Sequence, residues 1–168
     1  MKSIPALLCG LLFSVSIHGQ TGNSAHGIST QDKILLQEFW KDFADAVIRN
    51  DKAKLETLCE FPFYCRPCLD YLKSKNSNLV TLKVAKELFY KEHYKIFFEK
   101  ELKAGVRKHQ KFTIQFFHPY FNEEMKQHGI SFLYTLVPPS EHWEGTQGMI
   151  TLRKTEGKFK ITGIDVIP

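Results

Sequence analysis

The sequence lacks several features that would place it at once in a known class of protein. It contains no internal repeat, no glycine-rich phosphate-binding loop and no Gly-x-Ser-x-Gly motif around a nucleophilic serine. It also lacks the run of about 20 apolar residues that a membrane-spanning helix needs. These absences argue against a repeat protein, a P-loop nucleotide-binding protein, an α/β-hydrolase and a protein with a membrane span.

Basic residues are not concentrated in any one stretch. The 23 Lys and Arg residues outnumber the 18 Asp and Glu residues and give a net charge of +5, but they are spread among the acids. Proteins that bind nucleic acid usually carry their basic residues in a patch or stripe. We therefore expect no nucleic-acid partner and a surface of mixed charge.

Apolar residues, by contrast, are plentiful. Hydrophobic residues make up 43% of the chain and aromatic residues 13%, with 14 Phe among them. This composition excludes disorder over the whole chain, and 168 residues fit a single domain. We expect large rings to dominate the packing of its core.

The first 19 residues are typical of a secretory signal peptide. Lys2 precedes a short apolar run from Ile4 to Ile17, and Gly19 is a small residue suited to the cleavage position. We predict cleavage near Gly19-Gln20, which makes the mature protein secreted or periplasmic. Because the large side chain of Leu8 precedes Cys9, we do not expect a lipoprotein signal.

Residues 20–30 are rich in Gly, Ser and Asn and are predicted to be a flexible lead-in to one domain, residues 31–168. Apolar residues then recur at helical spacing, which predicts a first helix that ends near Asn50-Asp51. A short second helix is predicted over Lys52 to Cys59. Pro62 is incompatible with a continuing helix, so Glu60 to Tyr64 is predicted to be extended or a short edge strand.

The second half of the chain changes from helical to alternating spacing. Thr81 to Val106 is predicted to be the longest helix, and His118-Pro119-Tyr120 a turn. A short helix or turn is predicted at Asp70 to Lys75, and the predicted strands cover residues 112–117, 130–137, 148–154 and 159–167, with a hairpin turn at residues 156–158. Helices followed by a run of strands predict an α+β domain with N-terminal helices packed on a curved antiparallel sheet.

This order of elements, together with a set of aromatic residues, resembles nuclear transport factor 2-like domains, especially the secreted bacterial ones. The residues that carry the resemblance are Phe39 to Val47, Asn50-Asp51, Leu55 and Leu58, Phe61 to Phe63, and Phe89 to Phe97. The resemblance covers residues 31–168 and implies a cone-shaped sheet wrapped on a long helix, with an internal pocket. Members often form dimers, so a homodimer is an option. Some are isomerases or dehydratases, and many secreted members have no known activity, so the fold does not carry a function across.

Candidate binding residues follow from this resemblance. They are Trp40, Phe43, Tyr90, His93 and Tyr94, because cone folds leave part of their apolar wall uncovered. A stripe of rings such as this is more often part of the core than of a ligand site. Asp45 and His93 lie nearest to the acid or His that enzymatic members place in the cone, although a solvated helix face is the simpler interpretation of Asp45.

No catalytic constellation can be matched residue by residue. We therefore predict an exported domain that binds a small apolar ligand or another protein, with no catalytic residue and no cofactor assigned. His142-Trp143-Glu144 lies in a predicted loop between strands and is a candidate binding loop, since loops often carry function.

Cys59, Cys65 and Cys68 remain after removal of the signal peptide, and export makes a disulfide the default expectation. In a structural interpretation, Cys65 pairs with Cys68 or Cys59, and the third cysteine is buried or pairs across a dimer. In a redox interpretation, Cys65-Arg66-Pro67-Cys68 resembles the active-site stretch of thioredoxin-like proteins. Cys65 would then be the nucleophile and Cys68 the resolving thiol of a periplasmic thiol–disulfide oxidoreductase. In a third interpretation the thiols bind zinc, but no fourth ligand lies at motif spacing, so we predict no metal. We favour the structural interpretation.

Overall fold

The structure, a computed structural model, describes residues 27–69, 83–122 and 127–167. The predicted signal peptide, most of the predicted lead-in and the predicted turn or helix at Asp70 to Lys75 lie outside these residues. No helix among the described residues combines the length and the apolar character that crossing a membrane requires.

The domain begins with two helices joined by a tight two-residue turn. Helix α1 (Thr30–Arg49) starts at Ser29, whose hydroxyl accepts a hydrogen bond from the backbone N–H of Asp32 at 3.0 Å. It ends at Asn50, which adopts the left-handed conformation with φ 56°. Asp51 then caps α2 (Lys52–Leu58) through the N–H of Lys54. Both helices are confirmed as predicted.

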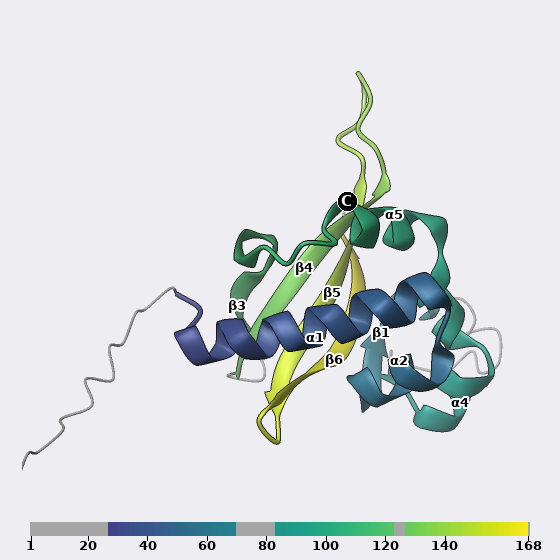
Figure 1. Ribbon diagram of the computed structural model, residues 1–168. Helices are drawn as coiled ribbons and strands as arrows, with labels where there is room; N and C mark the ends of the chain where they lie inside the picture. Colours follow the sequence, from purple (N-terminus) through teal and green to yellow (C-terminus); the bar gives the residue numbers. More distant parts are fainter. Residues whose placement is uncertain (1–26, 70–82, 123–126, 168) are drawn as a thin grey trace, which may run out of the picture.

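Six strands form one sheet within the described residues. They are β1 (Cys59–Cys65), β2 (Lys83–Val84), β3 (His118–Asn122), β4 (Gln127–Val137), β5 (Thr146–Thr155) and β6 (Lys158–Ile167), in the order β2-β1-β6-β5-β4-β3. The sheet is mixed rather than wholly antiparallel as predicted, because β1 runs parallel to β6. The α+β class is confirmed, with α1 lying across one face of the sheet (Figure 1).

The predicted strands of the second half agree with β4, β5 and β6 to within a few residues. The β5–β6 hairpin turn is also confirmed, since Glu156 and Gly157 both adopt positive φ angles of 50° and 76°. Two consecutive positive φ angles are typical of the tight turns that match the twist of paired strands, and Gly157 adopts its angle without strain.

The single helix predicted over Thr81 to Val106 is wrong. This stretch contains β2, then α4 (Lys86–Lys91), the 3-10 helix η1 (His93–Phe98) and α5 (Lys100–Lys108). The rings of Phe89 and Phe97 explain the breaks, because their centroids lie 6.1 Å apart and both pack near Phe63. Eight residues of straight helix would separate them by about 12 Å along the axis. Tertiary packing of the two rings therefore overrides the helical pattern.

The strand predicted over residues 112–117 is also wrong, and so is the turn predicted at His118-Pro119-Tyr120. Ile114–Phe116 forms a 3-10 turn, η2, and the strand β3 begins at His118. Phe116 and Phe117 are consecutive, yet both rings pack edge-on against Trp40, at 5.1 and 5.7 Å. A strand would send them to opposite faces. Pro119 is tolerated in β3 because β3 is an edge strand.

Aromatic rings fill the space between α1 and the sheet. Trp40 is buried and also contacts Phe43 and Phe132 at centroid distances of 5.8 and 5.3 Å. Its indole N–H donates a hydrogen bond to the backbone carbonyl of His109 at 2.8 Å. A buried donor is costly to leave unpaired, so this bond fixes the chain after α5 against α1.

A pH-dependent contribution to stability is expected from Glu60 on β1. Its carboxylate accepts hydrogen bonds from Arg153 and from Thr155, the latter at 2.6 Å. Burial acts to raise the pKa of Glu60, but the bonds from Thr155 and Arg153 outweigh it and leave the pKa below the usual 4.5. A lowered folded-state pKa stabilises the protein above the unfolded value and ceases to do so as the pH falls through the folded value.

We therefore expect Glu60→Gln to lower the free energy of unfolding at pH 7 by about 1–2 kcal/mol, since it weakens two charge-assisted hydrogen bonds. The loss should shrink as the pH falls through the lowered folded-state pKa of Glu60, where the wild-type carboxylate also becomes protonated. Urea unfolding at pH 7 and pH 3 measures it, with Glu38→Gln on the exposed face of α1 as the matched control. An equal loss at both pH values would contradict the assignment.

Candidate functional site

A groove of about 780 Å³ lies between α5 and the end of β4, and we call it the α5–β4 groove. Its apolar wall consists of Ala104, Phe116, Leu133, Leu136 and Pro138. Its polar lining includes Lys100, Glu101, Lys108, His109, His118 and Gln147. The groove is open to solvent rather than enclosed, so a ligand can enter it without any rearrangement of the backbone.

Two close approaches to Tyr134 shape the floor of the groove. Gly105 on α5 faces Tyr134 so closely that a Cβ atom there would lie 3.0 Å from the Cβ of the tyrosine. The Tyr134 ring covers Gly148 on β5, where a Cβ atom would lie 2.2 Å from the ring. Gly105 therefore lets α5 approach β4 closely at Tyr134. Gly148 leaves room for the tyrosine ring to lie over β5.

His109 and Tyr134 are neutral polar groups in the groove, and lysines at its rim are charged. Burial, together with Lys108, lowers the pKa of His109, so its imidazole is neutral at pH 7. Burial, together with Glu99 and Glu101, raises the pKa of Tyr134 far above its usual range, so its hydroxyl stays protonated. Lys100 and Lys108 line the rim as cations, and Glu101 forms an ion pair with Lys100 at 3.5 Å.

One wall of the groove is continuous with the aromatic core. The imidazole of His109 stacks on Phe116 with centroids 4.0 Å apart and planes 18° apart. Phe116 in turn packs against Trp40, whose indole N–H bonds the carbonyl of His109. Trp40 therefore fixes both members of the stacked pair, Phe116 by ring packing and His109 by a hydrogen bond, and this makes the wall rigid.

The structure separates the predicted pocket residues. Phe43 is fully buried in the core, and His93 is buried in η1, where burial lowers its pKa. Trp40 lines a second groove of about 520 Å³ between α1 and the residues that follow α5, with Ile34, Lys41 and Phe112 also in its lining. These predicted residues do not gather around one of the two grooves.

Tyr90 and Tyr94 face the outside of the domain. Tyr90 is exposed and Tyr94 is half-buried, and the ammonium group of Lys52 lies over both rings, 3.8 and 4.1 Å from their centroids. A cation over an aromatic face is attracted by the ring quadrupole. This contact joins the start of α2 to α4 and η1.

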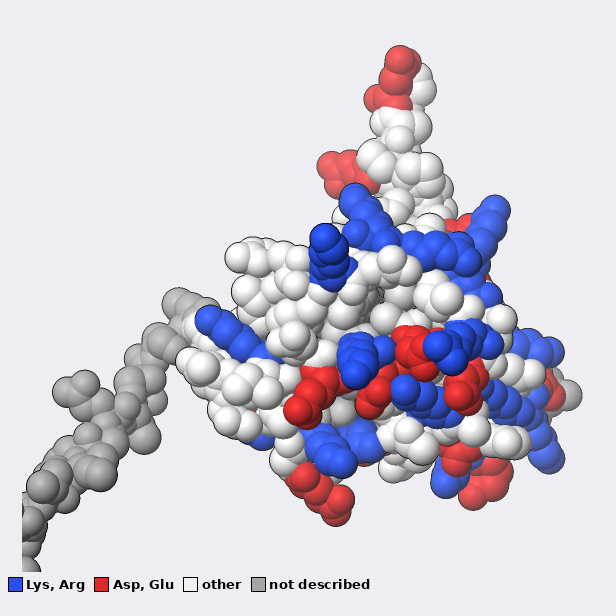
Figure 2. Space-filling view, in the orientation of Figure 1, with Lys and Arg blue, Asp and Glu red and all other residues white. Residues whose placement is uncertain are grey.

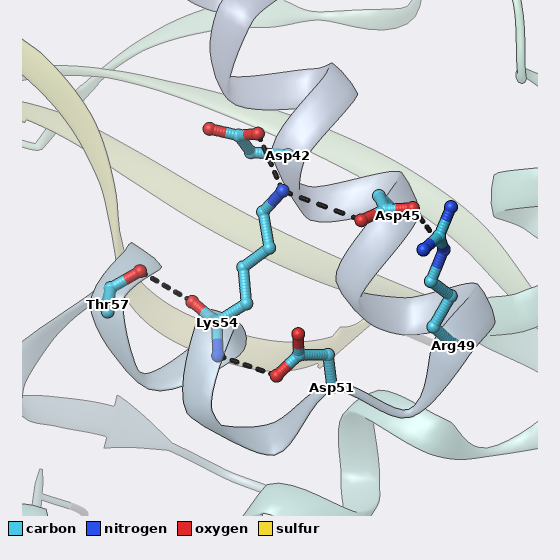
Figure 3. A network of polar contacts seen from close by, with 6 residues as sticks. All are labelled: Asp42, Asp45, Arg49, Asp51, Lys54 and Thr57. Atoms are coloured by element: carbon cyan, nitrogen blue, oxygen red, sulfur yellow. Dashed lines mark hydrogen bonds and ion pairs between the residues drawn. The ribbon is translucent and has the colours of Figure 1, made fainter.

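Asp45 lies in a network of ion pairs on the outer face of α1 (Figure 3). Its carboxylate contacts Arg49 at 2.6 Å and Lys54 at 3.5 Å, and Lys54 also contacts Asp42 at 2.8 Å. Lys54 belongs to α2, so the network holds the two helices together at their exposed sides. Asp45 is therefore on a solvated helix face, the simpler of its two interpretations.

Cys65 and Cys68 form a disulfide, which is one of the two pairings predicted by the structural interpretation. Both residues are buried, at 0% and 2% exposure. The loop between them is tied to β6, because the N–H of Arg66 donates to the carbonyl of Ile164 at 3.0 Å and its guanidinium contacts Asp165 at 2.8 Å. A catalytic disulfide must be reached by an attacking thiolate, so this burial favours a structural role.

Cys59 is a free thiol, buried at the start of β1. Burial raises its pKa well above the ordinary value, which disfavours the reactive thiolate. Among the described residues, no group of three or more His, Cys, Asp and Glu side chains is arranged to hold a metal ion.

The cysteines provide a direct test. We expect folded protein of residues 20–168 to show no fast reaction with a thiol reagent, because Cys59 is buried and Cys65 and Cys68 are bonded. Denaturant should release one thiol, and denaturant with reductant should release all three. Insulin reduction should not rise above that of a Cys65→Ser, Cys68→Ser control. Catalysed insulin reduction that this control lacks would instead establish the redox alternative.

Sequence reasoning missed the α5–β4 groove for identifiable reasons. Lys100 to Val106 falls in the last part of the predicted long helix, Lys108 and His109 lie just beyond it, and His118 falls in the stretch predicted to be a turn. The one local signal is Gly105, and a glycine late in a helical stretch does not by itself distinguish a helix end from a point of close approach. Nothing in the spacing of residues joins α5 to β4.

Comparison with known proteins leaves the family of this chain open. No model of a protein family matches the chain, and searches of curated proteins and of solved structures found no match either.

Proposed function

We propose that this protein is an exported, non-catalytic binding domain and that the α5–β4 groove is its ligand site. The ligand would combine an apolar body with a negatively charged group. The observation that carries the proposal is the groove itself, with a wall that includes Phe116, Leu133 and Leu136 beside a rim that carries Lys100 and Lys108.

The dimensions and the chemistry of the groove support this ligand class. Sites for small molecules commonly have volumes of about 300–1,000 Å³ and a few polar groups on mainly apolar walls. A carboxylate or sulfonate at the rim would gain charge-assisted hydrogen bonds from the lysines. The neutral His109 and Tyr134 would add polar partners without repelling an apolar body.

We propose further that the domain is a nuclear transport factor 2-like cone. Three observations support this: the helix pair α1 and α2, the strand at Phe61-Pro62-Phe63, and the meander β3 to β6 on which α1 packs (Figure 1). The broken helical stretch from Lys86 to Lys108 departs from the long helix of the resemblance. A groove beside α5 takes the place of an enclosed pocket behind Trp40.

The ligand class is tested with 11-(dansylamino)undecanoic acid, a fluorescent probe with an apolar chain and a carboxylate. We expect saturable binding, and weaker binding of its uncharged methyl ester. Lys108→Glu should weaken binding of the acid about tenfold, which corresponds to the loss of roughly one charge-assisted contact. Ala104→Trp should block the groove, because Ala104 is an exposed position that lines it.

Two matched controls accompany these variants. Lys111→Glu makes the same charge change on an exposed lysine outside the groove lining, and Ala104→Ser changes the helix position without filling the groove. Both should bind the acid like the wild type. Equal weakening by Lys111→Glu and Lys108→Glu, or equal binding of the ester and the acid, would refute the proposed site.

Export has its own test. When the full chain is produced in a bacterium with a secretory pathway, the exported product should have the mass of residues 20–168. Leu8→Arg should keep the precursor inside the cell, because a charge interrupts the apolar run. An exported product that still carries residues 1–19 would contradict the predicted cleavage.

A further inference from the structure

Strands β4 and β5 are joined by an arm that projects from the body of the domain (Figure 1). We define the β4–β5 arm as residues 137–146. Its tip is a tight turn in which the N–H of Ser140 donates to the carbonyl of Trp143 at 2.8 Å and the N–H of Trp143 donates to the carbonyl of Ser140 at 3.3 Å. The Trp143 side chain at this tip is 47% exposed.

The arm is an ordered element. Gly145 has a φ of +86°, and a Cβ atom there would lie 2.6 Å from the carbonyl oxygen of Val137 and 2.8 Å from the nitrogen of Pro139. Glycine is therefore required where the two sides of the arm meet, and Pro138 and Pro139 stiffen the backbone. An element that is already ordered loses less entropy when it binds.

The chemistry of the tip matches the ligand class of the α5–β4 groove. Trp143 offers a large apolar ring, and the exposed carboxylates of Glu141 and Glu144 lie within two residues of it. Figure 2 shows acidic side chains at the end of the arm and Lys and Arg side chains gathered over α5 at its foot. The tip and the groove are thus complementary in charge and in apolar character.

The groove lies at the root of the same arm, since Leu136, Pro138 and Gln147 belong to its lining. The arm extends away from the body, so its tip points away from its own groove (Figure 1). When two arms lie side by side and antiparallel, the tip of each arm reaches the root of the other. This follows because the distance from root to tip is the same in both copies. Such an arrangement is a closed, two-fold symmetric contact.

We propose that the groove is occupied by the arm of a second copy of this chain, in a symmetric dimer with exchanged arms. Trp143 of each copy enters the α5–β4 groove of the other, where Glu141 and Glu144 meet Lys100 and Lys108. This inference rests on the proposed function for the identity of the site and names its macromolecular partner. A small ligand in the groove then competes with dimerisation.

The decisive test uses charge reversal on the mature chain, residues 20–168. A tip variant carries Glu141→Lys and Glu144→Lys, and a groove variant carries Lys100→Glu and Lys108→Glu; all four positions are exposed, so both variants should fold. By sedimentation velocity at up to about 100 µM, a range that detects weak pairs, we expect the wild type to be dimeric and each variant alone to be monomeric. A mixture of the two variants should dimerise, because both contacts of the mixed pair then join opposite charges.

Trp143→Ala should also be monomeric, and as a monomer it should bind the dansyl acid more tightly than the wild type does at dimer-forming concentrations. A monomeric wild type, a dimer that persists in Trp143→Ala, or a mixture of variants that stays monomeric would each overturn the arm exchange. A monomeric wild type that still binds the dansyl acid overturns this inference alone. A dimeric wild type whose Trp143→Ala monomer binds no dansyl acid overturns the proposed small-ligand function alone.

Discussion

The indole of Trp40 is the contact on which the rest of the structure depends. Its ring meets Phe43, Phe116, Phe117 and Phe132, which come from α1, from η2 and the residue after it, and from β4. Its N–H bonds the carbonyl of His109 just after α5. One side chain thereby joins the first helix, the connection before β3 and the centre of the sheet. A smaller residue would lose both the ring contacts and the hydrogen bond to the carbonyl of His109.

The candidate site is a consequence of that anchoring. Because His109 is held at its carbonyl, its imidazole can lie on Phe116 and form one wall of the α5–β4 groove. The floor of the groove is determined by Gly105 and Gly148, which leave room for the Tyr134 side chain between α5 and β5. The same strand, β4, continues beyond the groove into the arm that carries Trp143. Groove and arm are therefore connected by one rigid element.

The errors of the sequence interpretation concern the middle of the chain, where rings had to reach partners from other elements. Phe89 and Phe97 lie in a stretch whose apolar residues recur at helical spacing. Both rings contact Phe63, however, and a straight helix would hold them too far apart for that. Phe116 and Phe117 alternate with polar residues as in a strand, but both must contact Trp40. The predicted pocket residues failed to gather in one groove for a related reason: Phe43 packs inward, whereas Tyr90 and Tyr94 face out and hold Lys52.

Local signals alone determined the ends of α1 and α2, the β5–β6 turn, the strands β4 to β6, the α+β class and a disulfide within the cysteine cluster. These depend on caps, turn residues, alternation and short spacing, all of which act within a few residues. Only the tertiary structure decided which cysteine Cys65 pairs with, where the long helical stretch breaks, and that Lys108, His109 and His118 line one groove. Those features arise from contacts between residues far apart in the chain, and the periodicity of a single segment carries no information about what lies opposite it.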